Sequence, residues 1–140
     1  MKGILVDASV SASWFLKDEK NDYSEWVLSQ MHSEKNIFVP SVWLLEITNL
    51  LFNAQRRRRI DRNFREAALM QIPRLSLTIL PAPTAADLPT LCLYSDKHQL
   101  TAYDAEYLRL AVEGGYLLAS LDGNLIAAAK RERVQVVAPR

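Results

Sequence analysis

The sequence of 140 residues has few of the residues that mark disulfide-bonded, zinc-binding or nucleotide-binding proteins. Its one cysteine, Cys92, excludes a disulfide within the chain and is expected to be a small core residue. Its two histidines, His32 and His98, match no metal-ligand spacing. Among its four glycines, Gly114-Gly115 lacks the further glycines and the preceding strand of a phosphate-binding loop. These absences argue against a disulfide scaffold, a zinc site and a nucleotide site.

Long hydrophobic runs are absent as well. The longest unbroken apolar run, residues 125–129, is far too short to cross a bilayer, and the N-terminal run 4–6 is too short for a secretory signal. With a single cysteine, this favours a reducing cytoplasm and no membrane. The content of 49% hydrophobic and 24% charged residues is ordinary for a globular chain, and we expect residues 1–140 to form one domain.

Short apolar segments alternate with segments of helical period along the whole chain. The expected strands are residues 2–6, 37–39, 76–80, 116–119 and 134–137. The expected helices are residues 7–16, 21–33, 41–58, 61–72, 84–98, 101–112 and 124–133, with Ser41 and Asp61 as N-caps and an interruption at Pro89. This alternation predicts an α/β fold with a parallel sheet covered on both faces.

Four acidic residues, Asp7, Glu46, Asp104 and Asp122, lie against sequence that should be buried. A buried carboxylate is costly unless it is paired, and no Lys or Arg lies near Glu46 or Asp122 in the sequence. All four could face one end of the sheet, where sites form in such folds. Carboxylates held together without basic partners favour a hard divalent cation and indicate a metal-dependent enzyme acting on phosphate esters.

Each acid also has a purely structural interpretation, which the sequence leaves open. Asp7 and Asp122 each precede an expected helix and are favoured N-cap residues. Asp104 follows Thr101 at the spacing of a capping box. Glu46 belongs with Asn49 and Asn53 to a polar stripe at i, i+3 and i+7, which fits an exposed helix face or a polar groove equally well.

Two basic groups are candidates for contact with a phosphate backbone or a partner protein. The first is the run Arg56, Arg57, Arg58 and Arg59, continued by Arg62 and Arg65, and the second is Lys130, Arg131 and Arg133. A solvated helix face is the simpler explanation of such a run.

Four short segments resemble the motifs of PIN-domain nucleases, in the same order. They are Val6-Asp7-Ala8-Ser9, Glu46-Ile47-Thr48-Asn49, Thr101-Ala102-Tyr103-Asp104-Ala105 and Ser120-Leu121-Asp122-Gly123-Asn124. The resemblance covers essentially the whole chain. In its small size, the chain resembles the VapC-type toxins of toxin–antitoxin pairs.

The resemblance implies a three-layer α/β/α sandwich with a central parallel sheet and an Mg²⁺- or Mn²⁺-dependent endoribonuclease. It implies Asp7, Glu46, Asp104 and Asp122 as catalytic residues and metal ligands. It places supporting polar side chains at Ser9, Asn49, Thr101, Ser120 and Asn124. The implied partners are an RNA substrate, a cognate antitoxin and a second copy of the chain in a homodimer.

Two other functions remain open on the sequence. The first is an aspartyl-phosphate phosphotransferase with Asp7 as the nucleophile, although Ser9 replaces the usual second acid and no lysine closely follows the strand at 116–119. The second is a non-catalytic module that binds a metal or RNA without turnover.

Overall fold

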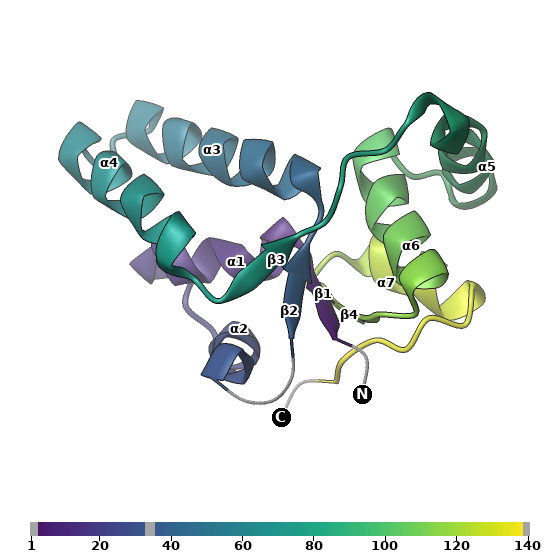
Figure 1. Cartoon of the computed structure of the whole chain (residues 1–140). Helices are drawn as coiled ribbons and strands as arrows, with labels where there is room; N and C mark the ends of the chain where they lie inside the picture. Colours follow the sequence, from purple (N-terminus) through teal and green to yellow (C-terminus); the bar gives the residue numbers. More distant parts are fainter. Residues whose placement is uncertain (1–2, 33–35, 139–140) are drawn as a thin grey trace.

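The structure, a computed structural model, describes residues 3–32 and 36–138 and has a parallel sheet at its centre (Figure 1). The strands are β1 (Ile4–Val6), β2 (Ile37–Val39), β3 (Leu77–Ile79) and β4 (Leu117–Ala119), in the order β3-β2-β1-β4. Every pairing is parallel, with Leu5 opposite Phe38 on one side and Leu118 on the other. The predicted parallel α/β sheet is therefore confirmed.

The expected strand at 134–137 is wrong as a regular strand. The segment meets β4 through a single isolated parallel bridge between Leu118 and Val136. Backbone hydrogen bonds hold it there, from the Leu118 N–H to the Gln135 carbonyl (3.0 Å) and from the Val137 N–H to the Leu118 carbonyl (2.8 Å). The apolar residues that suggested a strand are used instead as side-chain packing, since Val134 and Val137 both belong to the core.

Helices cover both faces of the sheet in the described part of the chain, which confirms the three-layer α/β/α arrangement (Figure 1). On one face lie α1 (Ala8–Phe15), α2 (Asp22–Ser29), α3 (Ser41–Arg56) and α4 (Arg62–Gln71), and on the other lie α5 (Leu88–His98), α6 (Ala102–Gly114) and α7 (Gly123–Arg131). Successive side chains of β1 point to opposite faces of the sheet, so both faces need a cover. Ile4 and Val6 enter the core on one face, and Leu5 enters the core on the other.

The helix boundaries follow local signals in most places. Asp61 and Thr101 accept hydrogen bonds from the first turns of α4 and α6. The expected cap at Ser41 is wrong, because Ser41 is the first residue of α3 and Pro40 is at the N-cap. Pro89 falls in the first turn of α5, where its missing N–H has no intrahelical partner to lose.

Two further expectations fail on this part of the chain. The second helix ends at Ser29 and passes into the turn η2 (Gln30–His32), and the expected end at residue 33 lies outside the described residues. Cys92 is exposed on α5 and is not part of the core.

Further 3₁₀ turns are η1 (Lys17–Glu19), η3 (Ile72–Arg74) and η4 (Ala85–Asp87). None of the described helices has the length and apolarity that crossing a membrane requires.

Candidate active site

Asp7 lies directly after the central strand β1 and is only 5% exposed. It occupies the N-cap position of α1, yet its side chain makes no capping hydrogen bond. Its Oδ2 atom instead accepts two hydroxyl hydrogen bonds, from Ser9 Oγ at 2.7 Å and from Ser120 Oγ at 2.8 Å. The carboxylate of Asp7 is thus oriented by side chains from two segments, and helix capping does not account for it.

The same two hydroxyls connect the ends of β1 and β4. Ser9 Oγ accepts the Leu121 N–H at 3.0 Å, and Ser120 Oγ accepts the Asp122 N–H at 3.0 Å. Because β1 and β4 are neighbouring parallel strands, this brings Asp122 to the same edge of the sheet as Asp7. Asp122 also caps α7, since its Oδ1 accepts the Asn124 N–H at 2.9 Å, so its capping interpretation is correct as well.

Glu46, on the second turn of α3, is connected to the other side of the sheet by Tyr107. The Tyr107 hydroxyl donates to Glu46 Oε1 at 2.7 Å and accepts the Ala8 N–H at 3.3 Å. Tyr107 is fully buried on α6. Sequence reasoning missed this residue, although its position three residues after Asp104 puts both on one helical face.

Asp104 lies in the first turn of α6, where its backbone N–H donates to Thr101 Oγ1 at 3.2 Å. Thr101 therefore acts as the predicted N-cap. The carboxyl group of Asp104 is half-buried, and the negative charges of Asp7 and Asp122 act on it.

The four acids influence one another electrostatically. The pKa of Glu46 is raised to about 7, mainly by burial and in part by the charges of Asp7 and Asp104, while the Tyr107 hydrogen bond opposes the shift. The pKa of Asp104 is raised to about 6, mainly by burial and in part by the charges of Asp7 and Asp122. Burial also raises the pKa of Asp7, against the two serine hydrogen bonds. Burial is the main cause of each shift, and no positive charge opposes it.

No lysine or arginine of the described segments forms an ion pair with any of the four acids. Nor, within residues 3–32 and 36–138, are three or more acidic, histidine or cysteine side chains arranged as a ready-made metal site. Like charges without a cation between them repel, which favours such an open arrangement. The donor set itself fits a hard divalent cation, because carboxylate oxygens are the ligands that Mg²⁺ and Mn²⁺ prefer.

The predicted supporting residues divide into two groups. Ser9, Ser120 and Thr101 make the hydrogen bonds given above. Asn49 is exposed on α3, one turn beyond Glu46, and Asn124 is exposed in the first turn of α7. The structure therefore connects three of the five directly to the segments that carry the acids.

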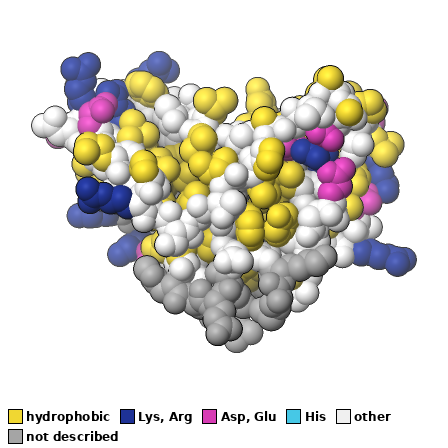
Figure 2. Space-filling model, in the orientation of Figure 1, with side chains coloured by type: hydrophobic (Ala, Val, Ile, Leu, Met, Phe, Trp, Pro, Cys, Tyr) yellow, Lys and Arg dark blue, Asp and Glu magenta, His cyan; other side chains and the backbone are white. Residues whose placement is uncertain are grey.

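The basic run Arg56 to Arg59 lies away from the acids, at the far end of α3. The helical rise places Arg56 on the order of 15 Å from Glu46 along the axis. Dark blue side chains gather at the corresponding left edge of the molecule in Figure 2. Arg59 is also engaged locally, with its Nη2 atom 2.8 Å from Asp18 Oδ1.

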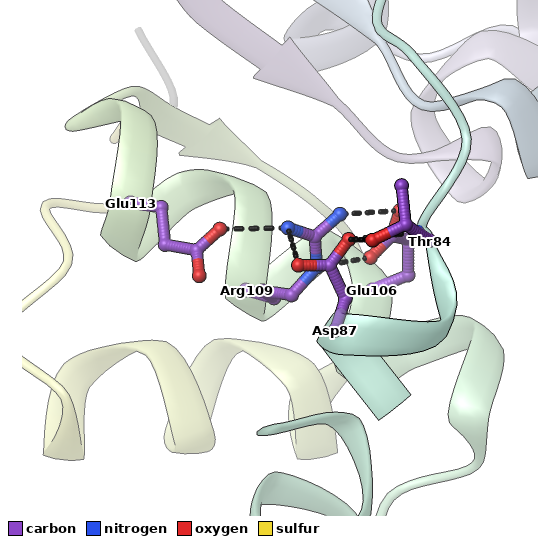
Figure 3. Close-up of polar contacts among 5 residues, drawn as sticks. All are labelled: Thr84, Asp87, Glu106, Arg109 and Glu113. Atoms are coloured by element: carbon purple, nitrogen blue, oxygen red, sulfur yellow. Dashed lines mark hydrogen bonds and ion pairs between the residues drawn. The ribbon is translucent and has the colours of Figure 1, made fainter. Parts of the chain in front are cut away.

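A second group of acids, which sequence reasoning missed, surrounds the buried Arg109 on α6 (Figure 3). Glu106 pairs with Arg109 Nε at 2.7 Å, Glu113 with Nη1 at 2.7 Å, and Asp87 with Nη1 at 3.5 Å. The i, i+3 and i, i+4 spacings of the two glutamates were visible in the sequence. The contact between Asp87 and Arg109, which connects η4 to α6, was not visible in the sequence.

Comparison with known proteins agrees with this fold. The model of the PIN-domain family matches residues 4–134, and the chain therefore belongs to that family. Members of the family are generally nucleases and usually use divalent metal ions.

Two solved structures are similar to the chain. PAE2754 from Pyrobaculum aerophilum is 24% identical, with a TM-score of 0.70 over 91% of this chain and 84% of that one. FitAcB from Neisseria gonorrhoeae is 16% identical, with a TM-score of 0.68 over 97% of each chain. At these identities the likeness concerns the fold. No match is found among curated proteins.

Proposed function

We propose that the protein is an Mg²⁺- or Mn²⁺-dependent endoribonuclease and the toxin of a type II toxin–antitoxin pair. The observation that carries the proposal is the set Asp7, Glu46, Asp104 and Asp122, whose charges act on one another without a basic partner in a chain of the PIN-domain family. We treat residues 1–140 as one PIN-like domain, and the cytoplasm as its compartment.

Asp7 and Asp104 would hold the principal cation, and Asp122 would bind a second one or act through water. A bound Mg²⁺ or Mn²⁺ supplies charge neutralisation at the phosphate and a more acidic water. Ser9 and Ser120 fix Oδ2 of Asp7, which keeps this ligand in one orientation.

Glu46 is the residue that we assign to proton transfer, in addition to metal binding. In the metal-free protein the pKa of Glu46 is about 7, which suits a group that exchanges a proton near neutral pH. The Tyr107 hydrogen bond holds Oε1 and leaves the second carboxylate oxygen for water or metal. Without the cation, the negative charge of the four acids would repel an RNA phosphate.

Two surfaces support the protein partners. Large apolar side chains are exposed on α3, α5 and α6, namely Leu45, Leu88, Leu93 and Tyr103, and these suit a second copy of the chain in a homodimer. A groove of about 390 Å³ is lined by residues of α1, α2 and α4, including Trp14, Leu28 and Phe64, and suits a segment of an antitoxin.

Single-stranded RNA incubated with the protein provides the test. We expect internal cleavage with Mg²⁺ or Mn²⁺, no cleavage in EDTA, and no cleavage by a folded Asp7→Asn variant. Expression without an antitoxin should arrest growth for the wild type and not for Asp7→Asn. A folded Asp7→Asn protein that cleaves RNA as fast as the wild type would overturn the assignment.

The same assay separates the alternatives. A non-catalytic module would bind RNA or Mn²⁺ and leave the RNA intact. A phosphotransferase would transfer phosphate to Asp7 from a small phosphodonor, which mass spectrometry of the intact protein would detect.

A further inference from the structure

A polar cavity of about 390 Å³ lies beside α7, on the side of the C-terminal end of α5. Its lining residues are Lys97, His98, Gln99, Asn124 and Arg131. Every one of them is polar, and three have side chains that carry or can carry a positive charge. Such a lining suits an anion and not an apolar ligand.

One end of the cavity lies at the first turn of α7, which Asp122 caps by accepting the Asn124 N–H at 2.9 Å. Asn124 comes two residues after Asp122, in the first turn of α7, and Arg131 is the last residue of the same helix. Seven residues separate Asn124 from Arg131, which puts both on one face, about 10 Å apart along the axis. The cavity therefore runs along α7 from the turn that Asp122 caps to the last residue of the helix.

Its charges are not fully neutralised by the protein. Arg131 has no acidic partner within ion-pair distance among the described residues. Lys97 Nζ and His98 Nε2 share Glu132 Oε2, at 2.7 Å and 2.6 Å. The buried His98 Nδ1 has no hydrogen-bond partner within residues 3–32 and 36–138. Glu132 is thus shared between Lys97 and the imidazole of His98, and Arg131 is left without a carboxylate.

We propose that this cavity binds a backbone phosphate of the RNA strand, next to the phosphate that is cleaved. Arg131 supplies the main positive charge, Lys97 a second one shared with Glu132, and the amides of Asn124 and Gln99 supply N–H donors. The inference rests on the proposed function, because it concerns the same substrate strand. It also reassigns the basic contact from Arg56–Arg59 to Arg131.

A helix-dipole role for Arg131 accounts for fewer of these observations than phosphate binding does. A basic residue in the last turn of α7 stabilises the negative end of that helix. That role requires neither the neighbouring Lys97 from α5 nor a cavity that reaches Asn124. The dipole role predicts a loss of stability on replacing Arg131, whereas the phosphate role predicts a loss of RNA affinity.

The test is the affinity of a fluorescein-labelled single-stranded RNA, measured by anisotropy with Ca²⁺ in place of the active metal, between about 50 and 200 mM salt. We expect Arg131→Gln to weaken binding about tenfold and to reduce the slope of log affinity against log salt by about one. Lys97→Gln should have a smaller effect in the same direction. Arg74→Gln, an equal charge change on η3 and outside the cavity, is the control and should leave the slope unchanged.

Glu132→Gln provides a test of opposite sign. This variant keeps side-chain hydrogen bonding but frees Lys97 from its carboxylate, so RNA should bind more tightly. The subsite is overturned if Arg131→Gln has the affinity and salt slope of Arg74→Gln, or if the wild type binds no RNA. Cleavage is scored separately, so that RNA binding without cleavage would count against the proposed function and not against the subsite.

Discussion

Helix α6 carries members of two acidic clusters that the protein treats in opposite ways. Glu106 belongs to the first cluster, in which three carboxylates surround the guanidinium of Arg109 (Figure 3). Asp104, two residues earlier, belongs to the second cluster, with Asp7, Glu46 and Asp122. The residue types are the same, and the difference is a single arginine.

That difference appears in the protonation of the two clusters. A backbone hydrogen bond from Thr84 and the charge of Arg109 lower the pKa of Asp87, and Glu106 raises the pKa of Arg109. Among the unpaired acids the direction is reversed, with the pKa of Glu46 at about 7 and that of Asp104 at about 6. The fold neutralises acids that fasten its helices and leaves unneutralised those that we assign to catalysis.

The largest expected effect comes from a matched pair of substitutions on α6. Asp104→Asn should reduce RNA cleavage about a thousandfold or more, because it removes a carboxylate that we assign to the metal. It should not lower the melting temperature in EDTA, since it removes one of several like charges. Rates are measured under single-turnover conditions at saturating Mn²⁺.

Glu106→Gln is the matched control for this variant. It should retain cleavage within a few-fold and lose stability, because it removes the charge that pairs with buried Arg109. If the two variants lose activity equally, the clusters do not differ in the way described.

The second effect concerns the acidic cluster around Arg109. Arg109→Met should reduce the free energy of unfolding by about 3 kcal/mol at neutral pH, because it leaves Glu106 buried without a positive partner. Urea denaturation measures the loss. The double variant Arg109→Met/Glu106→Gln should recover part of this loss. A loss below about 1 kcal/mol for Arg109→Met would show that the buried ion pair contributes no more to the free energy of unfolding than an exposed one does.

The third effect is the pH dependence of stability in EDTA. The folded pKa values of Glu46 (about 7, from 4.5) and Asp104 (about 6, from 3.8) are raised, so the folded state binds more protons. Their stabilising contribution is complete below the unfolded pKa values and is lost as pH rises through about 6 and 7. We expect the melting temperature to fall by a few degrees between about pH 5 and pH 8.

Two comparisons assign this pH effect to the unpaired acids. Glu46→Gln should flatten the fall above about pH 6, and saturating Mn²⁺ should raise the melting temperature at pH 8 by binding the folded state. A melting temperature that rises over this range, or a curve that Glu46→Gln leaves unchanged, would contradict the shifts.

The smallest effect concerns Tyr107. Tyr107→Phe removes the donor to Glu46 and the acceptor of the Ala8 N–H, at a cost of about 1 kcal/mol in stability. Because the Tyr107 hydrogen bond lowers the pKa of Glu46, its loss should move the acidic limb of the rate–pH profile to higher pH. An unshifted profile with a normal rate would leave Tyr107 a packing residue.

Much of the fold was predictable, because local signals decide it. The strands at β1, β2, β3 and β4 are short apolar runs, and the helix starts at Asp61 and Thr101 are capping residues that act within one turn. The segment at 134–137 was predicted wrongly for a related reason. Its apolar pattern reports burial, whereas a strand also requires a neighbour that pairs along its length.

The candidate site also combines features set by neighbouring residues with features set by distant contacts. The sequence by itself determined which acids lack a nearby basic residue and that Asp7 and Asp122 follow strands, because these are properties of neighbouring residues. The tertiary structure alone decided that two serine hydroxyls meet on one oxygen of Asp7, that Tyr107 reaches Glu46 across the sheet, and that Arg109 gathers Asp87. Such contacts join residues far apart in the chain, so they exist only once the sheet and its helices have packed.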